Sequence, residues 1–112
     1  MLTEKNFVET TKDLIQNNYD FIYKKDCNQS ICYYIPNTTN EGCLFGQVLA
    51  KLGVNINDLN GPIDNILKNL NIGFSEQTIK WASFIQIAQD NGVRWGICLL
   101  LANEADITSG VL

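Results

Sequence analysis

The sequence predicts a small α+β domain that is mostly helical, with about five helices and one β-hairpin. Apolar residues recur at helical spacing in five stretches of the 112-residue chain. Two short runs rich in aromatic and β-branched residues, joined by a polar linker, have the character of paired strands. One hairpin with several helices belongs to the α+β class. No repeat or long linker divides the chain, so we expect one domain over residues 1–112, with a loose tail from about residue 107.

Four of the five expected helices have a local signal at their start or their end. Thr3 and Ser75 are N-cap residue types, and Pro62 suits the first position of a helix. Gly53 is expected to adopt the left-handed conformation that ends a helix, and Asn91-Gly92 is expected to end another. The expected helices are residues 3–18, 42–52, 62–70, 76–90 and 93–105.

The hairpin is expected from two aromatic runs. Tyr19–Lys24 forms the first strand and Ser30–Ile35 the second, and Pro36 ends the second strand because it lacks a backbone N–H. Side chains alternate between the two faces of a strand, so Tyr33 and Tyr34 should point to opposite faces, one buried and one exposed.

Charge and composition exclude some classes of function for this chain. The net charge is −4 and the basic residues are scattered, with Arg94 the single arginine, so a duplex nucleic acid is not an expected partner. A small anion remains compatible, because a cation and backbone amides can converge in a pocket. No stretch is apolar enough to span a membrane and the N-terminus lacks the pattern of a signal peptide, so we expect a cytoplasmic protein.

Catalysis and metal binding have little basis in the residue types. The chain has no histidine, the commonest acid–base group near neutral pH, so we do not expect an enzyme or a cofactor. Cys43, at the start of the second helix, could be an activated thiol or a small buried side chain. The spacing of Cys27 and Cys32 is at the outer edge for a zinc ligand pair, with no second pair, so all four cysteines, Cys98 included, are expected to be free and metal-free.

A split pattern resembles a small domain often encoded by bacteriophages and prophages. Its parts are a Cys-x-Tyr strand at Cys32, a Gly-Cys-Leu-x-Gly helix at Gly42 that ends in Leu-Gly, and a late Gln-Asp-x-Gly-x-x-Trp-Gly element at Gln89. The resemblance covers residues 14–102 and implies no particular activity. If the chain is phage-encoded, it would act in the host cytoplasm.

The late element is the best candidate for a binding site. Arg94 could hold a phosphate or carboxylate, and Trp95 could stack on a base; alternatively, Asn91-Gly92 is a helix stop and Trp95 a core residue. The expected ligand-binding residues are Arg94, Trp95, Asp90, Gln89, Tyr33, Tyr34, Cys43 and Gln47.

Two functions from different classes follow. The first is a non-catalytic phage anti-defence protein whose oligomer sequesters a small nucleotide immune signal, such as a cyclic nucleotide, in pockets at subunit boundaries. The alternative is a phage inhibitor or adaptor that binds a host protein directly. A homo-oligomer is expected because the helix at residues 76–90 is apolar on most sides and is followed by the apolar run Ile97–Ala102.

Overall fold

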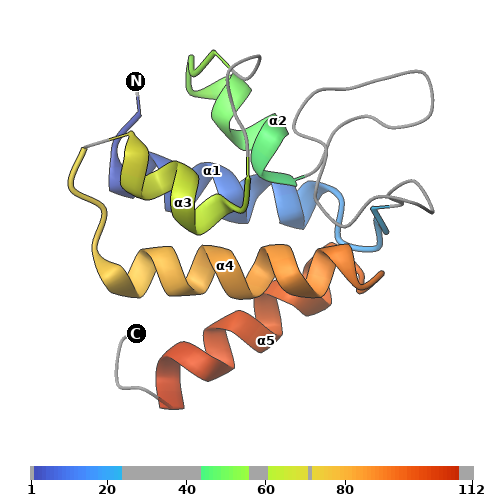
Figure 1. The fold of residues 1–112 in the computed structure, drawn as a ribbon. Helices are drawn as coiled ribbons and strands as arrows, with labels where there is room; N and C mark the ends of the chain where they lie inside the picture. Colours follow the sequence, from blue (N-terminus) through green and yellow to red (C-terminus); the bar gives the residue numbers. More distant parts are fainter. Residues whose placement is uncertain (1, 24–43, 56–60, 71, 109–112) are drawn as a thin grey trace.

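The computed structural model describes residues 2–23, 44–55, 61–70 and 72–108, with side chains described as far as residue 104 in the last range. Over these ranges the chain forms five α-helices and no strand (Figure 1). The helices are α1 (Glu4–Asn17), α2 (Leu44–Lys51), α3 (Ile63–Asn69), α4 (Glu76–Asp90) and α5 (Trp95–Thr108).

Helix α4, with 15 residues, is the longest of the five and lies at the centre of the packing. It packs against α3 on one side and against α5 on the other, while α1 packs against α2 and α5 (Figure 1). After the turn that follows α4, α5 runs back beneath it, so the two form an antiparallel helical hairpin. One layer of helices therefore covers each side of α4.

The prediction of an α+β fold is wrong: the described residues are all-α. The first expected strand, Tyr19–Lys24, is described as far as Tyr23 and forms a turn followed by an irregular segment. Its carbonyl groups accept hydrogen bonds from a helix instead of a strand, since Gly96 N donates to Tyr19 O (2.8 Å) and Trp95 N donates to Phe21 O (3.0 Å). The second expected strand, Ser30–Ile35, lies outside the described residues.

The two predicted side-chain caps lie at the helix starts where they were expected. Thr3 Oγ1 accepts from Asn6 N at the start of α1, and Ser75 Oγ accepts from Thr78 N at the start of α4. Such side-chain caps satisfy amides that a helix leaves without partners. Helix α5 extends further than expected, through Thr108, so residues 107 and 108 are helical and do not belong to a loose tail.

Two helices end in the same glycine motif. Gly53 and Gly92 have φ values of 83° and 84°, in the left-handed region. After α2, Gly53 N donates to Ala50 O and the next amide donates to Leu49 O; after α4, Gly92 N donates to Gln89 O and the next amide donates to Ala88 O. This pair of bonds defines a Schellman motif, which confirms both expected helix stops.

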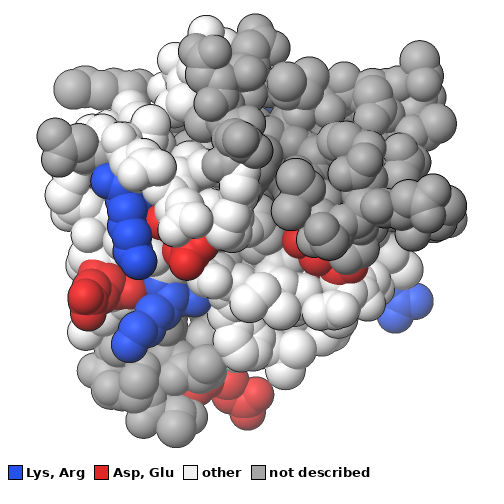
Figure 2. Space-filling view, viewed as in Figure 1, with Lys and Arg blue, Asp and Glu red and all other residues white. Residues whose placement is uncertain are grey.

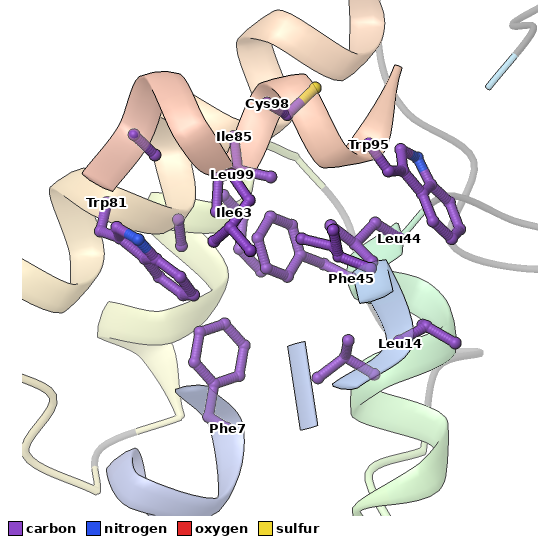
Figure 3. Packing of buried hydrophobic residues seen from close by; sticks show 14 of the residues in the cluster. Phe7, Leu14, Leu44, Phe45, Ile63, Trp81, Ile85, Trp95, Cys98 and Leu99 are labelled. Carbon is purple, nitrogen blue, oxygen red and sulfur yellow. The ribbon is translucent and has the colours of Figure 1, made fainter. Parts of the chain in front are cut away.

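The core gathers apolar side chains from all five helices (Figure 3). Phe7 of α1 stacks on Phe45 of α2, with ring centroids 5.5 Å apart, and meets the edge of Phe74 at 5.3 Å. Trp81 and Trp95 lie toward opposite ends of the cluster (Figure 3). None of the described helices is both long enough and apolar enough to cross a bilayer.

Candidate functional site

The turn between α4 and α5 carries four of the expected ligand-binding residues, and the structure separates them by exposure. Arg94 is exposed and Asp90 is half-buried, whereas Gln89 is fully buried and Trp95 is 1% exposed. The four therefore do not form one open surface. Only Arg94 and, in part, Asp90 can meet a ligand in the solvent without a change in the packing.

Trp95 belongs to the core. Its ring lies 4.5 Å from the ring of Phe21, centroid to centroid, and beside Leu44 in the view of Figure 3. Its Nε1 is buried and has no hydrogen-bond partner among the described residues, whereas the indole of Trp81 donates to Asn103 Oδ1 at 3.0 Å. In this position the faces of the Trp95 ring are covered by protein. The burial favours the core alternative for Trp95 over stacking on a base.

Two buried glutamines connect α4 to the starts of other helices. Gln89 Oε1 accepts from Leu44 N, the first amide of α2, at 2.8 Å, and Gln86 Oε1 accepts from Ile63 N, the first amide of α3, at 2.7 Å. Gln89 Nε2 donates to Asp90 Oδ1 at 3.0 Å. A buried amide needs such a partner, because burial without a hydrogen bond is costly. The structure thus gives Gln89 a structural role that sequence reasoning missed.

A signal for this role is present in the sequence. Gln86 and Gln89 are three residues apart, which places them on one side of a helix. That side also carries Ala82 and Ile85, both fully buried. Two glutamines within a buried helical stripe need hydrogen-bond partners inside the protein, and the starts of neighbouring helices are the most common source of unpaired amides.

The described helix starts are occupied by groups of the protein itself. Thr3 and Ser75 cap α1 and α4, and the glutamines of α4 cap α2 and α3. The first two amides of α5 donate to the carbonyl groups of Phe21 and Tyr19. A helix start binds an anion through free amides. The amides named here are already paired, so they offer no ready site for a phosphate.

Of the remaining expected site residues, the structure describes Gln47, which belongs to α2. Gln47 is half-buried, takes part in an interaction within the chain, and lies one turn after Leu44 on α2. The bond between Gln89 and Leu44 N brings the late sequence element and the start of α2 together. Tyr33, Tyr34 and Cys43 lie outside the described residues.

Cys98 is the cysteine that the structure describes, and it is buried as a free thiol. Its Sγ donates to Val93 O at 3.4 Å. Burial raises the pKa of Cys98 from 9.0 to about 11, and the nearby Asp90 carboxylate adds to the rise. A thiol with a raised pKa is a poor nucleophile near neutral pH. Among the described residues no group of cysteine and acidic side chains is placed to hold a metal ion.

Large apolar side chains are exposed along α4 and α5. Five of the exposed large hydrophobic residues belong to these two helices: Phe84, Ile87, Ile97, Leu100 and Leu101. Leu100 is 53% exposed and Ile87 60%. In the view of Figure 2, most charged side chains gather toward the left end of the α4 region and a few lie toward its right end, with uncharged surface between them. Depletion of charge with exposed aromatic and aliphatic side chains is typical of a contact surface.

Comparisons of the chain with models of protein families, with curated proteins and with solved structures find no match.

Proposed function

We propose that this chain is a binding protein that acts without catalysis, by contact with another protein through the exposed apolar side chains of α4 and α5. The observation that carries the proposal is the exposure of Phe84, Ile87, Ile97, Leu100 and Leu101 on two adjacent helices. Scattered apolar residues are normal on a protein surface, but a concentration on one helical hairpin marks an interaction site.

The charge distribution supports the same proposal. Between Lys80 and Glu104 the sequence holds two charged residues, Asp90 and Arg94. Asp90 already accepts a hydrogen bond from Gln89. The centre of a protein–protein interface is depleted of charge, whereas a site for an anionic small molecule gathers cations.

The resemblance to a phage-encoded domain suggests what the partner would be. A phage protein that acts without catalysis meets host proteins in the host cytoplasm, and binding can block or redirect one of them. We therefore propose an inhibitor or adaptor of a host protein. The absence of histidine from the sequence is the reason for proposing binding rather than an enzymatic activity.

Sequestration of a small nucleotide signal is the second candidate. Arg94 favours it, because its side chain is exposed at the turn before α5 and is the single guanidinium of each subunit. A guanidinium binds phosphate through two parallel hydrogen bonds. With Trp95 buried, the rest of such a pocket would come from a second subunit rather than from the Trp95 ring.

Two experiments, one for each candidate function, test these proposals. Tagged protein is used to capture partners from host lysate. Phe84→Gln/Ile87→Gln is the interface variant, and Ile72→Gln, at an exposed apolar side chain that belongs to neither α4 nor α5, is the control. Loss of a captured protein with the double variant but not with the control supports the contact surface, and capture that both variants retain contradicts it.

Native mass spectrometry of protein purified from host cells tests the second candidate. A nucleotide that is released by heat and is lost in Arg94→Ala, with an unchanged melting temperature, would favour sequestration. Protein without a bound small molecule, or a nucleotide that Arg94→Ala retains, would exclude Arg94 as its site.

A further inference from the structure

Helix α5 presents a stripe of five exposed residues on one side. They are Arg94, Ile97, Leu100, Leu101 and Glu104. Residues three, four and seven apart share a helix face, since the helix has 3.6 residues per turn. Arg94 precedes the first residue of α5, but its carbonyl accepts from Cys98 N at 2.9 Å, so it continues the helical path. The α5 stripe thus has an apolar middle, a cation at one end and an anion at the other.

The opposite side of α5 faces the core. Trp95, Cys98, Leu99 and Ala102 are buried there. The α5 stripe therefore lies on the side of the helix turned away from the core. Its apolar side chains keep part of their surface open to solvent: Leu100 is 53% exposed, Leu101 39% and Ile97 37%.

The order of residues in the α5 stripe is self-complementary. Arg94 and Glu104 are equally distant in sequence from position 99, and so are Ile97 and Leu101. If two copies of α5 pack antiparallel about that position, Arg94 of each lies opposite Glu104 of the other, and Ile97 of each lies opposite Leu101. All of these pairs align at the same time, because both helices have the same rise per residue.

We propose that a second copy of this chain packs its α5 stripe antiparallel against this one, with two Arg94–Glu104 pairs closing the ends of an apolar contact. A two-fold contact uses the same patch on both subunits, so a patch of this kind must be complementary to itself. An unrelated partner would need a stripe of the same length with the two charges in the opposite order. A second copy of α5 provides that order when it packs antiparallel to the first.

The charge order also argues against a purely local role. The start of a helix carries a partial positive charge and the end a partial negative charge, so an acidic residue is favoured near the start and a basic residue near the end. Helix α5 has the reverse, with Arg94 before its first residue and Glu104 in its second half. Neither charge is placed to stabilise α5 through its dipole, and a contact between subunits gives both a function. Glu104 also takes part in an interaction within its own chain, which the second copy's guanidinium would share or replace.

A second copy of the chain would occupy the α5 part of the proposed contact surface. The inference rests on the proposed function in treating α5 as a contact surface. Phe84 and Ile87 of α4 remain for a different partner. Dimerisation and capture of a host protein are measured separately, so the failure of one is distinguishable from the failure of the other.

Charge reversal and restoration test the proposed pairing. The mass of the full-length protein is measured by light scattering and sedimentation equilibrium for wild type, Arg94→Glu, Glu104→Arg and the variant with both changes. Each reversal agrees with the helix dipole, so the monomer should stay folded, which circular dichroism checks. Each single reversal places like charges opposite each other twice per dimer, and we expect the dissociation constant to rise about tenfold or more. The double variant restores opposite charges and should recover the wild-type dissociation constant.

A second measurement covers the apolar middle. Leu100→Gln should weaken the dimer, while Ile72→Gln, the control outside α4 and α5, should leave it unchanged. If the wild-type protein stays monomeric at concentrations on the order of 100 micromolar, the inference is overturned. A dimer that tolerates both single reversals, or one that the double variant fails to restore, assigns the contact to another surface and overturns it as well.

Discussion

Gln86 and Gln89 show how single polar side chains set the positions of whole helices. Each is buried on α4, and each accepts a hydrogen bond from the first amide of a neighbouring helix. A hydrogen bond from a buried amide contributes modestly when made, but an amide left unpaired costs about 1–3 kcal/mol. These two side chains therefore hold the starts of α2 and α3 against α4 more strictly than apolar contacts would.

Replacing Gln89 with leucine should destabilise the domain. The change keeps the side-chain size but leaves the Leu44 amide without its partner, so we expect the free energy of unfolding to fall by about 1–3 kcal/mol. Gln77→Leu, at an exposed glutamine of the same helix, is the matched control and should change it by less than about 0.5 kcal/mol. Urea denaturation of both variants makes the comparison. Equal stabilities would show that the bond to Leu44 does not hold α2.

Cys98 should make the stability depend on pH in alkaline solution. Its thiol has a pKa of about 11 in the folded protein, against 9.0 for the ordinary thiol. Above pH 9 the unfolded chain loses this proton while the folded protein keeps it, so the free energy of unfolding falls as the pH rises from about 9 to 11 and is unaffected by Cys98 below that window. Other groups titrate in the same range, so the wild type is compared with Cys98→Ala by urea denaturation at several pH values. The variant should show a smaller fall, and parallel curves would refute the assignment.

At the scale of elements, the segment after α1 packs directly on the start of α5. Two backbone hydrogen bonds link them, and the ring of Tyr19 lies against Gly96. A Cβ atom at Gly96 would meet three carbons of that ring, all far inside the 3.0 Å that real Cβ contacts respect. Glycine at this position is therefore required by the close approach of a neighbouring side chain, and not by its backbone angles.

Gly96→Ala should destabilise this contact between the segment after α1 and α5. We expect a loss of about 1–3 kcal/mol in the free energy of unfolding, because the Tyr19 ring must move as a whole to admit the methyl group. Removing the ring gives the matched test, since Gly96→Ala in a Tyr19→Ala background has no such contact and should cost far less. Thermal and urea denaturation of the four proteins measure the coupling. If the two changes are additive, the tyrosine is not the reason for the glycine.

At the scale of the whole molecule, the aromatic cluster around Phe7 joins segments distant in sequence. Phe7 is fully buried and contacts Phe45 of α2 and Phe74, which precedes α4. A domain of this size has a small stability, about 5–15 kcal/mol. A side chain that holds three segments together is therefore a large part of what keeps the domain folded.

Phe7→Ala should bring the domain close to unfolding. Truncation of a buried phenylalanine typically costs about 3–5 kcal/mol through lost burial and the cavity left behind. Val8→Ala, at a half-buried neighbour on the same helix, should cost about 1 kcal/mol. Urea midpoints compare the two variants with wild type. Similar shifts for both would mean that the core does not depend on the Phe7 ring.

The sequence by itself determined that helices form in these five regions, and it located the caps and glycine stops that bound several of them. The caps at Thr3 and Ser75 and the stops at Gly53 and Gly92 depend on hydrogen bonds and backbone angles within a few residues, so local residue types suffice to predict them. The apolar character of the residue 76–90 helix was also evident from the sequence.

Tertiary structure alone decided the rest. Tyr19 to Tyr23 has the composition of a strand, yet its carbonyl groups accept from the free amides of α5, a helix more than seventy residues further along the chain. Trp95 and Gln89 belong to a pattern that suggested a binding site, but packing buries both, one against Phe21 and the other against the start of α2. A residue type states which hydrogen bonds and apolar contacts a side chain requires, and only the packing of distant segments determines which groups provide them.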